Sequence, residues 1–459
     1  MNAPRLFLIL ALAGCAAAPD GADGPGRQIT VAMPEMRHFQ PRAAEPTDRS
    51  NAEIARDFMD LTFMLESGRP LPVLTRFEGP ITLRVAGTAP PTLSRDLDLL
   101  LDRLRQEAGI PIRRTPDAPA AITVEAVPRA RMRQAVPEAA CFVIPRVSSW
   151  AEFSANRRSP LIDWTTLTER DRVGIFIPAD VSPQEIRDCL HEELAQALGP
   201  LNDLYRLEDS VFNDDNFHAV LTGFDMLILR AIYAPELRSG QTPAEVARAL
   251  PRVLARLNPS GQRGADPLRP RETGAWTEAI GQAVGMRGSL DARRRAAREA
   301  IAIAGRAGWR DHRLAFSLYA LGRLSISEAP RDAIEAFLQA GAIYEGHPET
   351  RIHAAHVAMQ VAAFTLSAGH PEATIATVDA HTTTARTARN AALLTSLLLI
   401  KSEALAYQGH TAQAAALRTD ALGWGLYGFG DPSDVIDRLA EIAAIAPPRP
   451  VRALEKDPA

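Results

Sequence analysis

The stretch HEELAQALGPLND, residues 191–203, decides the fold. It closes a segment, residues 182–199, that has the signals of an α-helix at both ends. Ser182 is followed by a proline and, three residues on, by a glutamate, which is the pattern of a helix N-terminus. Gly199 stands where the helix should stop, because glycine accepts backbone conformations that end a helix. We therefore expect one helix that leads into a polar turn.

Polar side chains recur along this stretch with the spacing of one helix face. Glu192 and Gln196 are four residues apart and therefore project from the same side of the helix. Gly199 permits a turn that brings Asn202 beneath them, with Asp203 adjacent. A carboxylate and two amides would suit a hard divalent cation better than zinc. We predict the alternative, a hydrogen-bond network that holds the turn with no metal or other cofactor.

Short apolar runs and amphipathic segments surround this helix on its N-terminal side. Alternating or continuous apolar residues predict β-strands, and segments with an apolar face predict helices. The expected strands are residues 79–87, 120–127, 141–145 and 172–178, and the expected helices are residues 51–68, 92–109 and 182–199. This order predicts an α+β domain with one mixed sheet, in which residues 172–178 form an edge strand.

The chain changes character after about residue 285, where Ala-rich segments are punctuated by Gly and Pro. Gly322, Gly369 and Gly409 are expected to close the first helix of successive pairs. Their spacing suits stacked pairs of helices. This predicts an all-α domain of helical hairpins, with an irregular helical bundle as the alternative.

Three further polar features need an interpretation. His191 stands alone at the start of the motif and is expected at the surface or at a cap. The run NDDN, residues 213–216, lacks the spacing of a calcium-binding loop and is interpreted as a turn whose side chains cap the backbone. His353 and His356 are three residues apart, but no third ligand lies nearby, so we expect a polar helix face.

The N-terminus resembles that of an exported lipoprotein. Arg5 and the short apolar run LFLILALA fit a secretory signal, because the run is too short to span a bilayer comfortably. The run ends in LAGC, which resembles a lipobox with Cys15 as the lipidated residue. Ala16 in place of Asp favours the outer membrane in such proteins. An ordinary signal peptide is the alternative.

Composition narrows the possible partners and pairings. The net charge is -4 and the isoelectric point about 6.2, which gives no basic field for nucleic acid. A hydrophobic content of 46% over 459 residues is enough for two or three domains. Export would leave Cys141 and Cys189 as an even pair in an oxidising compartment, so we predict a disulfide between them, with two free thiols as the alternative.

The region of residues 70–240 resembles metzincin metallopeptidases, whose zinc helix reads H-E-x-x-H-x-x-G-x-x-H. From Glu192 this chain reads E-E-x-x-Q-x-x-G-x-x-N, so Glu193 holds the general-base position while all three histidines are replaced. Ser210 holds its place in the turn that follows, and Phe212 stands where that family has Met. The resemblance implies a zincin fold with a vestigial base, followed by a closing helix at residues 221–233.

The chain is most similar to an uncharacterised proteobacterial family of exported proteins with E-E-x-x-Q-x-L-G-x-x-N-D and S-x-F-N-D-D motifs. The helical part loosely resembles tetratricopeptide repeats. The predicted division is a signal peptide (1–14), a flexible tether (15–50), a degenerate metzincin-like domain (51–265), a helical repeat domain (285–445) and a disordered tail (446–459).

These features lead to three functional hypotheses. The first is an outer-membrane lipoprotein, facing the periplasm, whose inactive peptidase-like domain and helical scaffold bind envelope proteins or peptides, for instance by adding a strand to the sheet edge. The second is a metal-dependent envelope hydrolase with Glu193 as base and a divalent cation held by Glu192, Gln196 and Asn202. The third is a structural lipoprotein whose cleft binds nothing.

Overall fold

The computed structural model describes residues 32–137, 139–263 and 271–448. These residues divide into two compact units. Unit 1 comprises residues 40–321, and unit 2 comprises residues 32–39 and 322–448. The predicted signal peptide, the lipidation residue Cys15 and nearly all of the predicted tail lie outside the described residues.

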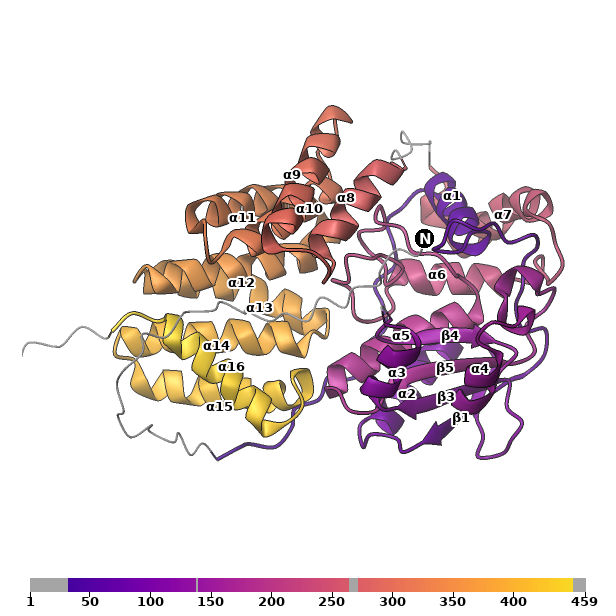
Figure 1. Cartoon of the computed structure of the whole chain (residues 1–459), viewed down its shortest axis with the longest axis horizontal. Helices are drawn as coiled ribbons and strands as arrows, with labels where there is room; N and C mark the ends of the chain where they lie inside the picture. Colours follow the sequence, from indigo (N-terminus) through magenta and orange to yellow (C-terminus); the bar gives the residue numbers. More distant parts are fainter. Residues whose placement is uncertain (1–31, 138, 264–270, 449–459) are drawn as a thin grey trace, which may run out of the picture. The chain divides into compact units, whose positions relative to one another are not determined.

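Unit 1 contains a five-stranded sheet and a set of helices, several of which pack against that sheet (Figure 1). Its strands are β1 (Ile81–Gly87), β2 (Ile112–Arg114), β3 (Ile122–Val127), β4 (Phe142–Pro145) and β5 (Val173–Pro178). Its helices are α1 (Asn51–Thr62), α2 (Leu93–Glu107), α3 (Arg129–Ala135), α4 (Trp150–Asn156), α5 (Pro183–Leu198), α6 (Gly223–Ile232), α7 (Pro243–Leu257), α8 (Gly274–Val284), α9 (Leu290–Arg306) and most of α10 (His312–Ser325).

The strand order is β2-β1-β3-β5-β4, with β4 antiparallel to β5 and the other neighbours parallel. The sheet is therefore mixed, as predicted. The expected edge strand at residues 172–178 is wrong, because β5 lies between β3 and β4. Every residue of β5 is buried, which fits a strand that is covered on both faces and paired on both sides. The edge next to the motif helix is β4.

Alternation along β5 separates two apolar cores. Ile175 and Ile177 belong to the larger core, which includes the buried faces of α1, α2, α5, α6 and α7. Phe176 points to the other face and packs with Phe142 and Phe153 at ring-centroid distances of 5.3 and 5.5 Å. The short helices α3 and α4 cover this second core. They were not expected from the sequence, since segments of seven residues leave little periodicity to detect.

Residues 35–50, within the segment predicted as a tether, make ordered contacts. In unit 2 the amide of Arg37 donates to the carbonyl of Gly423 at 2.9 Å, and the ring of Phe39 lies 4.5 Å from that of Trp424. In unit 1 the carbonyl of Glu45 lies so close to Gly223 that a Cβ there would meet it at 1.8 Å. This part of the predicted tether is therefore packed chain.

Unit 2 is all-α. Its helices are α11 (Pro330–Glu345), α12 (Arg351–Ser367), α13 (Pro371–Thr387), α14 (Ala391–Tyr407), α15 (Thr411–Gly428) and α16 (Pro432–Ile445), and α10 ends in it (Figure 1). Successive helices from α11 to α15 pack against one another. The coarse prediction of α+β followed by all-α is thus confirmed.

Two of the three predicted terminating glycines do follow a helix end. Gly369 and Gly409 have φ of 75° and 88°, a backbone conformation that favours glycine. Gly322 does not close a helix as predicted, because it lies inside α10. A Cβ at Gly322 would meet the ring of Phe337 at 2.7 Å. Its small size serves close helix packing and not a turn.

The predicted polar face of α12 is also wrong. His353 is 0% exposed and His356 is 2% exposed. The ring of His353 lies 4.9 Å from that of Tyr344, and the ring of His356 lies 3.4 Å from the amide nitrogen of Asn390. Both imidazoles are therefore core groups that pack between helices.

In the described part of the chain no helix is both long and apolar enough to cross a membrane.

Candidate functional site

Helix α5 forms for the local reasons read from its sequence. The hydroxyl of Ser182 accepts a hydrogen bond from the amide of Glu185, and Pro183 occupies the first turn. Gly199 is the C-cap, and a Cβ there would meet the side chain of Ile232 on α6 at 2.3 Å. Gly199 therefore ends the helix and also lets α6 approach its end.

The predicted disulfide is present. Cys141, beside β4, is bonded to Cys189 on α5, with a Cα–Cα distance of 5.9 Å. The bond fixes the motif helix to the antiparallel edge of the sheet. Apolar packing of α5 against β4 and β5 reinforces the same contact.

The carboxylates of Glu192 and Glu193 meet beside this disulfide. One ligand atom from each, together with Cys141 Sγ, lies within 4.8 Å of the others. Among residues 32–137, 139–263 and 271–448 this is the only such group of His, Cys, Asp or Glu. Glu193 is 0% exposed and Glu192 is half-buried. Cys141 is a disulfide sulfur, so it offers no thiolate, and only two carboxylates remain as donors.

The other predicted motif residues take separate positions. Gln196 is buried, at 1% exposure. Asn202 donates from Nδ2 to the carbonyl of Asp60 at the end of α1, at 3.0 Å, and Leu201 donates from its amide to the carbonyl of Leu61. Asn202 therefore secures the turn to α1. Asp203 instead lines a pocket beyond the helix end.

His191 is buried at 3% exposure, so the expected surface position is wrong. Its Nδ1 accepts a hydrogen bond from the amide of Leu221 at 3.2 Å. Leu221 lies just before α6, and the imidazole thus joins the motif helix to the segment that begins the closing helix. An Nδ1 that accepts requires the tautomer without a proton on that nitrogen.

Arg170 holds the C-terminal end of α5 and was not foreseen from the sequence. Its guanidinium donates to the carbonyls of Gln196, Ala197 and Gly199 at 2.5, 2.7 and 2.5 Å. The side chain is 2% exposed, and burial lowers its pKa to about 10. Carbonyls at a helix C-terminus have no partner within the helix and carry partial negative charge, which a cation stabilises.

The turn after the motif is held by one buried carboxylate. Asp225 accepts hydrogen bonds from the hydroxyl of Ser210 at 2.5 Å and from the amides of Val211 and Thr222 at 3.2 and 2.7 Å. Burial raises the pKa of Asp225 to about 6, against these hydrogen bonds, which lower it. Phe212, at the position where the resembled family has Met, is 0% exposed.

The run NDDN forms the predicted side-chain-capped turn. Asn213 Oδ1 accepts from the amide of Asp215 at 3.0 Å, and Asp215 Oδ1 accepts from the amide of Phe217 at 3.2 Å. The amide of Leu204 also donates to the carbonyl of Phe212 at 2.9 Å. This backbone bond brings the residues after the motif helix alongside the NDDN turn.

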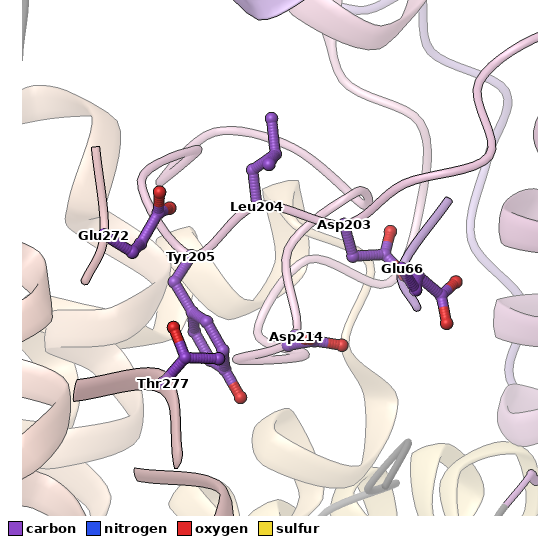
Figure 2. Close-up of a pocket in the computed structure, with 7 residues that line it drawn as sticks. All are labelled: Glu66, Asp203, Leu204, Tyr205, Asp214, Glu272 and Thr277. Atoms are coloured by element: carbon purple, nitrogen blue, oxygen red, sulfur yellow. The ribbon is translucent and has the colours of Figure 1, made fainter. Parts of the chain in front are cut away.

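A pocket opens where these two segments meet (Figure 2). Its cavity is about 140 Å³, and the described residues that line it are Glu66, Asp203, Leu204, Tyr205, Asp214, Glu272 and Thr277. Asp203 was predicted as part of the motif cluster, whereas Glu66 and Glu272 were not singled out. They come from segments more than 200 residues apart, and no local pattern in the sequence links them.

A buried charge network lies beside the pocket. Asp57 is 0% exposed and sits between Arg49 and Arg206, at 3.1 and 2.9 Å. Arg206 also pairs with Asp60 at 2.6 Å and with Glu272 at 3.2 Å. An unpaired buried charge is costly. In this cluster each guanidinium lies next to carboxylates, so the buried charges are paired and the cost is reduced.

Comparison with known proteins gives a family resemblance for part of the chain. Residues 51–252 match the model of a family described as "Protein of unknown function (DUF2927)". The match covers the sheet, α5 and α6, and it ends within α7. It agrees with the expected similarity to an uncharacterised family. No curated protein and no solved structure matches the chain.

Proposed function

We propose that the chain is a lipoprotein of the bacterial outer membrane, facing the periplasm, that binds envelope proteins or peptides and does not catalyse a reaction. The LAGC stretch with Cys15 supports a lipid anchor. The chain has a net charge of -4, so it has no overall basic field that would attract nucleic acid. In this proposal residues 51–265 form a degenerate metzincin-like domain. Residues 285–445 form a scaffold of tetratricopeptide-like helical hairpins that offers a second binding surface.

The observation behind this proposal is the burial of Glu193, which is 0% exposed. A general base must reach, directly or through one water, the proton that it removes. Here the corresponding carboxylate lies within the packed interior beside the Cys141–Cys189 disulfide. A group in that position is suited to holding the helix in place, and not to activating a water for a substrate.

The donors at the three metal positions of the motif do not fit zinc. Zinc prefers His, Cys or carboxylate ligands around one open position. Gln196 and Asn202 offer amide oxygens, and the Asn202 amide is engaged with the carbonyl of Asp60. In this proposal the chain uses these positions for packing and hydrogen bonds, and not for zinc.

The order of elements supports the metzincin-like assignment. The mixed sheet is followed by α5, then by the Ser210–Phe212 turn and then by α6. In such a domain an extended peptide could pair with an exposed strand edge. The edge available beside α5 is that of β4, which is the last strand in the order β2-β1-β3-β5-β4.

A metal-dependent hydrolase is the second candidate, and one observation favours it. The carboxylates of Glu192 and Glu193 converge within 4.8 Å of each other, which is close enough for two ligands of one cation. In this candidate the cation would be held by carboxylates, and the interior around Glu193 would have to open to substrate.

One experiment separates the two candidates. Full-length protein purified without chelators is analysed for metal, and its cleavage of a random peptide library is followed by mass spectrometry with and without EDTA. We expect no stoichiometric metal and no cleavage that EDTA or Glu193→Gln abolishes. The exposed substitution Glu299→Gln is the matched control. A bound metal together with cleavage lost in Glu193→Gln would replace the binding proposal with the hydrolase.

A further inference from the structure

The N-terminal segment of residues 34–39 lies along helix α15 of unit 2 (Figure 1). It forms neither a helix nor a strand. The amide of Arg37 donates to the carbonyl of Gly423 at 2.9 Å, and the rings of His38 and Phe39 contact rings of α15. We call residues 34–39 the strap. Unit 2 therefore already holds a linear peptide segment, which comes from its own chain.

Four residues of α15 receive the strap, namely Asp420, Gly423, Trp424 and Tyr427. They follow one another at intervals of three, one and three residues, which places them on one face of the helix. Trp424 is 8% exposed and Tyr427 is 2% exposed. We call these four residues the strap face. A single helix thus presents a continuous surface to the strap.

Phe39 makes the aromatic contacts of the strap. Its ring centroid lies 4.5 Å from that of Trp424, with the planes tilted by 31°, and 6.2 Å from that of Tyr427 in an edge-on arrangement. Both geometries are favourable for aromatic pairs, which contribute beyond simple burial of apolar area. The strap face therefore has a defined place for an aromatic side chain.

Arg37 contributes a charge contact two residues before Phe39. Its guanidinium pairs with Asp420 at 3.2 Å, and the same carboxylate pairs with Arg386 on α13 at 3.2 Å. Arg386 also lies over the ring of Trp424 at 5.4 Å. An ion pair this exposed adds little affinity, but it discriminates against a residue of the wrong charge. The strap face thus favours a basic residue two positions before an aromatic one.

Gly423 lets the strap approach the helix backbone. A Cβ there would meet Cγ of Arg37 at 2.9 Å and the carbonyl oxygen of Glu35 at 3.0 Å. Glycine inside a helix is unfavourable, so its presence needs a reason. The other glycines within α15 have a different reason, because a Cβ at Gly425 would meet α16 and one at Gly428 would meet α14. Gly423 alone of these three makes room for the strap.

The strap leaves one polar group of the strap face unused. The indole N–H of Trp424 is buried, and none of the described residues accepts a hydrogen bond from it. Buried indole N–H groups usually have an acceptor. A peptide that placed a carbonyl oxygen at this N–H would gain a contact that the strap lacks. The strap itself is only partly covered, since the Arg37 side chain is 58% exposed and Phe39 is half-buried.

We propose that the strap face binds a linear segment of a partner protein that carries an arginine two residues before an aromatic residue. The strap occupies this site within the chain, and the partner displaces it. The assignment rests on the proposed function, for which it names the chemistry and the regulation of peptide binding by residues 285–445. A segment of the same chain competes at an effective concentration on the order of millimolar, so only a partner that binds more tightly gains access.

The test is a fluorescence anisotropy titration of full-length protein with the labelled, capped peptide PEMRHFQ, the sequence of residues 34–40. Wild-type protein should bind it weakly, because the strap occupies the site. Arg37→Ala combined with Phe39→Ala empties the site and should bind the peptide at least about tenfold more tightly. A comparison peptide with alanine at the phenylalanine position should bind this double variant at least about tenfold more weakly, because it lacks the ring that meets Trp424.

Glu35→Ala changes an exposed side chain of the strap and is the matched control, which should keep the weak wild-type affinity. Gly423→Val added to the double variant should abolish binding, because the new side chain fills the space of the peptide backbone. If Gly423→Val does not fold, the comparison of the two peptides still decides, since it uses one unchanged protein.

Equal affinity of wild type and double variant, or equal binding of both peptides, would overturn the assignment. Analytical ultracentrifugation covers the remaining occupant, which is the strap of a second copy. A wild-type dimer that the double variant converts to a monomer would replace the partner segment with that second copy.

These outcomes are separable from those of the proposed function. A metal-bound, Glu193-dependent hydrolase would overturn the proposed function whichever peptide binds. Failure of the peptide to bind the double variant, with no metal and no cleavage, would overturn only the assignment of the strap face.

Discussion

Arg170 Nη1 lies 2.7 Å from the carbonyl oxygen of Ala197, at the end of the motif helix. The same guanidinium donates to the carbonyls of Gln196 and Gly199, so one buried cation provides hydrogen bonds to the carbonyls at the end of α5. The disulfide at Cys189 attaches the same helix to the segment beside β4. The arginine and the surrounding packing therefore hold the C-terminal end of the motif helix in place.

The first prediction concerns Arg170. Arg170→Gln should lower the free energy of unfolding by roughly 3 kcal/mol, because several hydrogen bonds to a charged donor are lost and buried carbonyls keep no partner. Arg170→Lys should lower the free energy of unfolding by a smaller amount, since lysine keeps the charge but not the planar set of donors. Urea denaturation of the full chain measures both. Arg256→Gln, which breaks an exposed pair with Glu236, is the control and should cost under about 1 kcal/mol. A similarly small effect of Arg170→Gln would contradict the capping role.

The second prediction concerns the pH dependence of stability through Asp225. Its pKa is about 6 in the folded chain against an ordinary 3.8, so between these values the folded state holds more protons than the unfolded state. Stability from this group should therefore fall as pH rises from about 4 to about 6, by about 3 kcal/mol in total. Asp225→Asn should remove this part of the slope.

The measurement is the urea midpoint of wild type and variant at several pH values between 4 and 7. Burial also raises the pKa of Asp188 to about 6, so the Asp225→Asn variant should keep a similar slope from that residue. Asp188→Asn therefore serves as the reference for a second, independent contribution. An unchanged slope in Asp225→Asn would show that the carboxylate is ionised in the fold despite its burial.

Local signals in the sequence were enough for the motif helix and the disulfide. Ser182 and Gly199 mark the two ends of α5 because capping depends on residues within one turn. Cys141 and Cys189 could be paired by counting, since the predicted lipobox would use the third cysteine. The mixed sheet followed by helices could also be predicted from periodicity and from the order of the segments.

What the sequence did not reveal depends on contacts between distant segments. The strand at residues 173–178 was placed at an edge, but edge and centre are decided by β4 folding back beside it. The local sequence predicts a helix terminator at Gly322, because it does not show the contact with Phe337 on another helix that requires a small residue there. Arg170 and Glu272 gave no signal, since a lone charged residue in a loop does not indicate what it will meet.

The third prediction concerns the disulfide. Cys141→Ala combined with Cys189→Ala should lower the free energy of unfolding by about 4 kcal/mol, because the bond closes a loop with a sequence separation of 48. Labelling of unfolded, unreduced mature protein should find neither cysteine as a free thiol. Two labelled cysteines in protein isolated from the envelope would show that the bond does not form in the cell.

The fourth prediction concerns the anchor. Cys15→Ser should move the protein from the membrane fraction to the soluble periplasm, because lipid chains on one cysteine would be its attachment. Fractionation with a salt wash, followed by immunoblotting, measures the change. A variant that stays in the pellet would rule out Cys15 as the anchor.

The fifth prediction concerns Asn202, at the position of the third metal ligand in the resembled family. Its Nδ2 donates to the carbonyl of Asp60, so its structural role depends on a donor and not on a ligand atom. Asn202→Ala should lower the free energy of unfolding by about 1–2 kcal/mol, because the Asp60 carbonyl loses its partner. Asn202 itself is only 7% exposed, so the lost bond lies away from solvent. Asn202→Asp should cost more, since a carboxylate oxygen would face the carbonyl oxygen and carry charge into the interior.

A metal role for Asn202 predicts the reverse order, because a carboxylate is the stronger ligand and would raise both metal content and stability. Urea denaturation and metal analysis of the two variants, in the same buffer, decide between these orders.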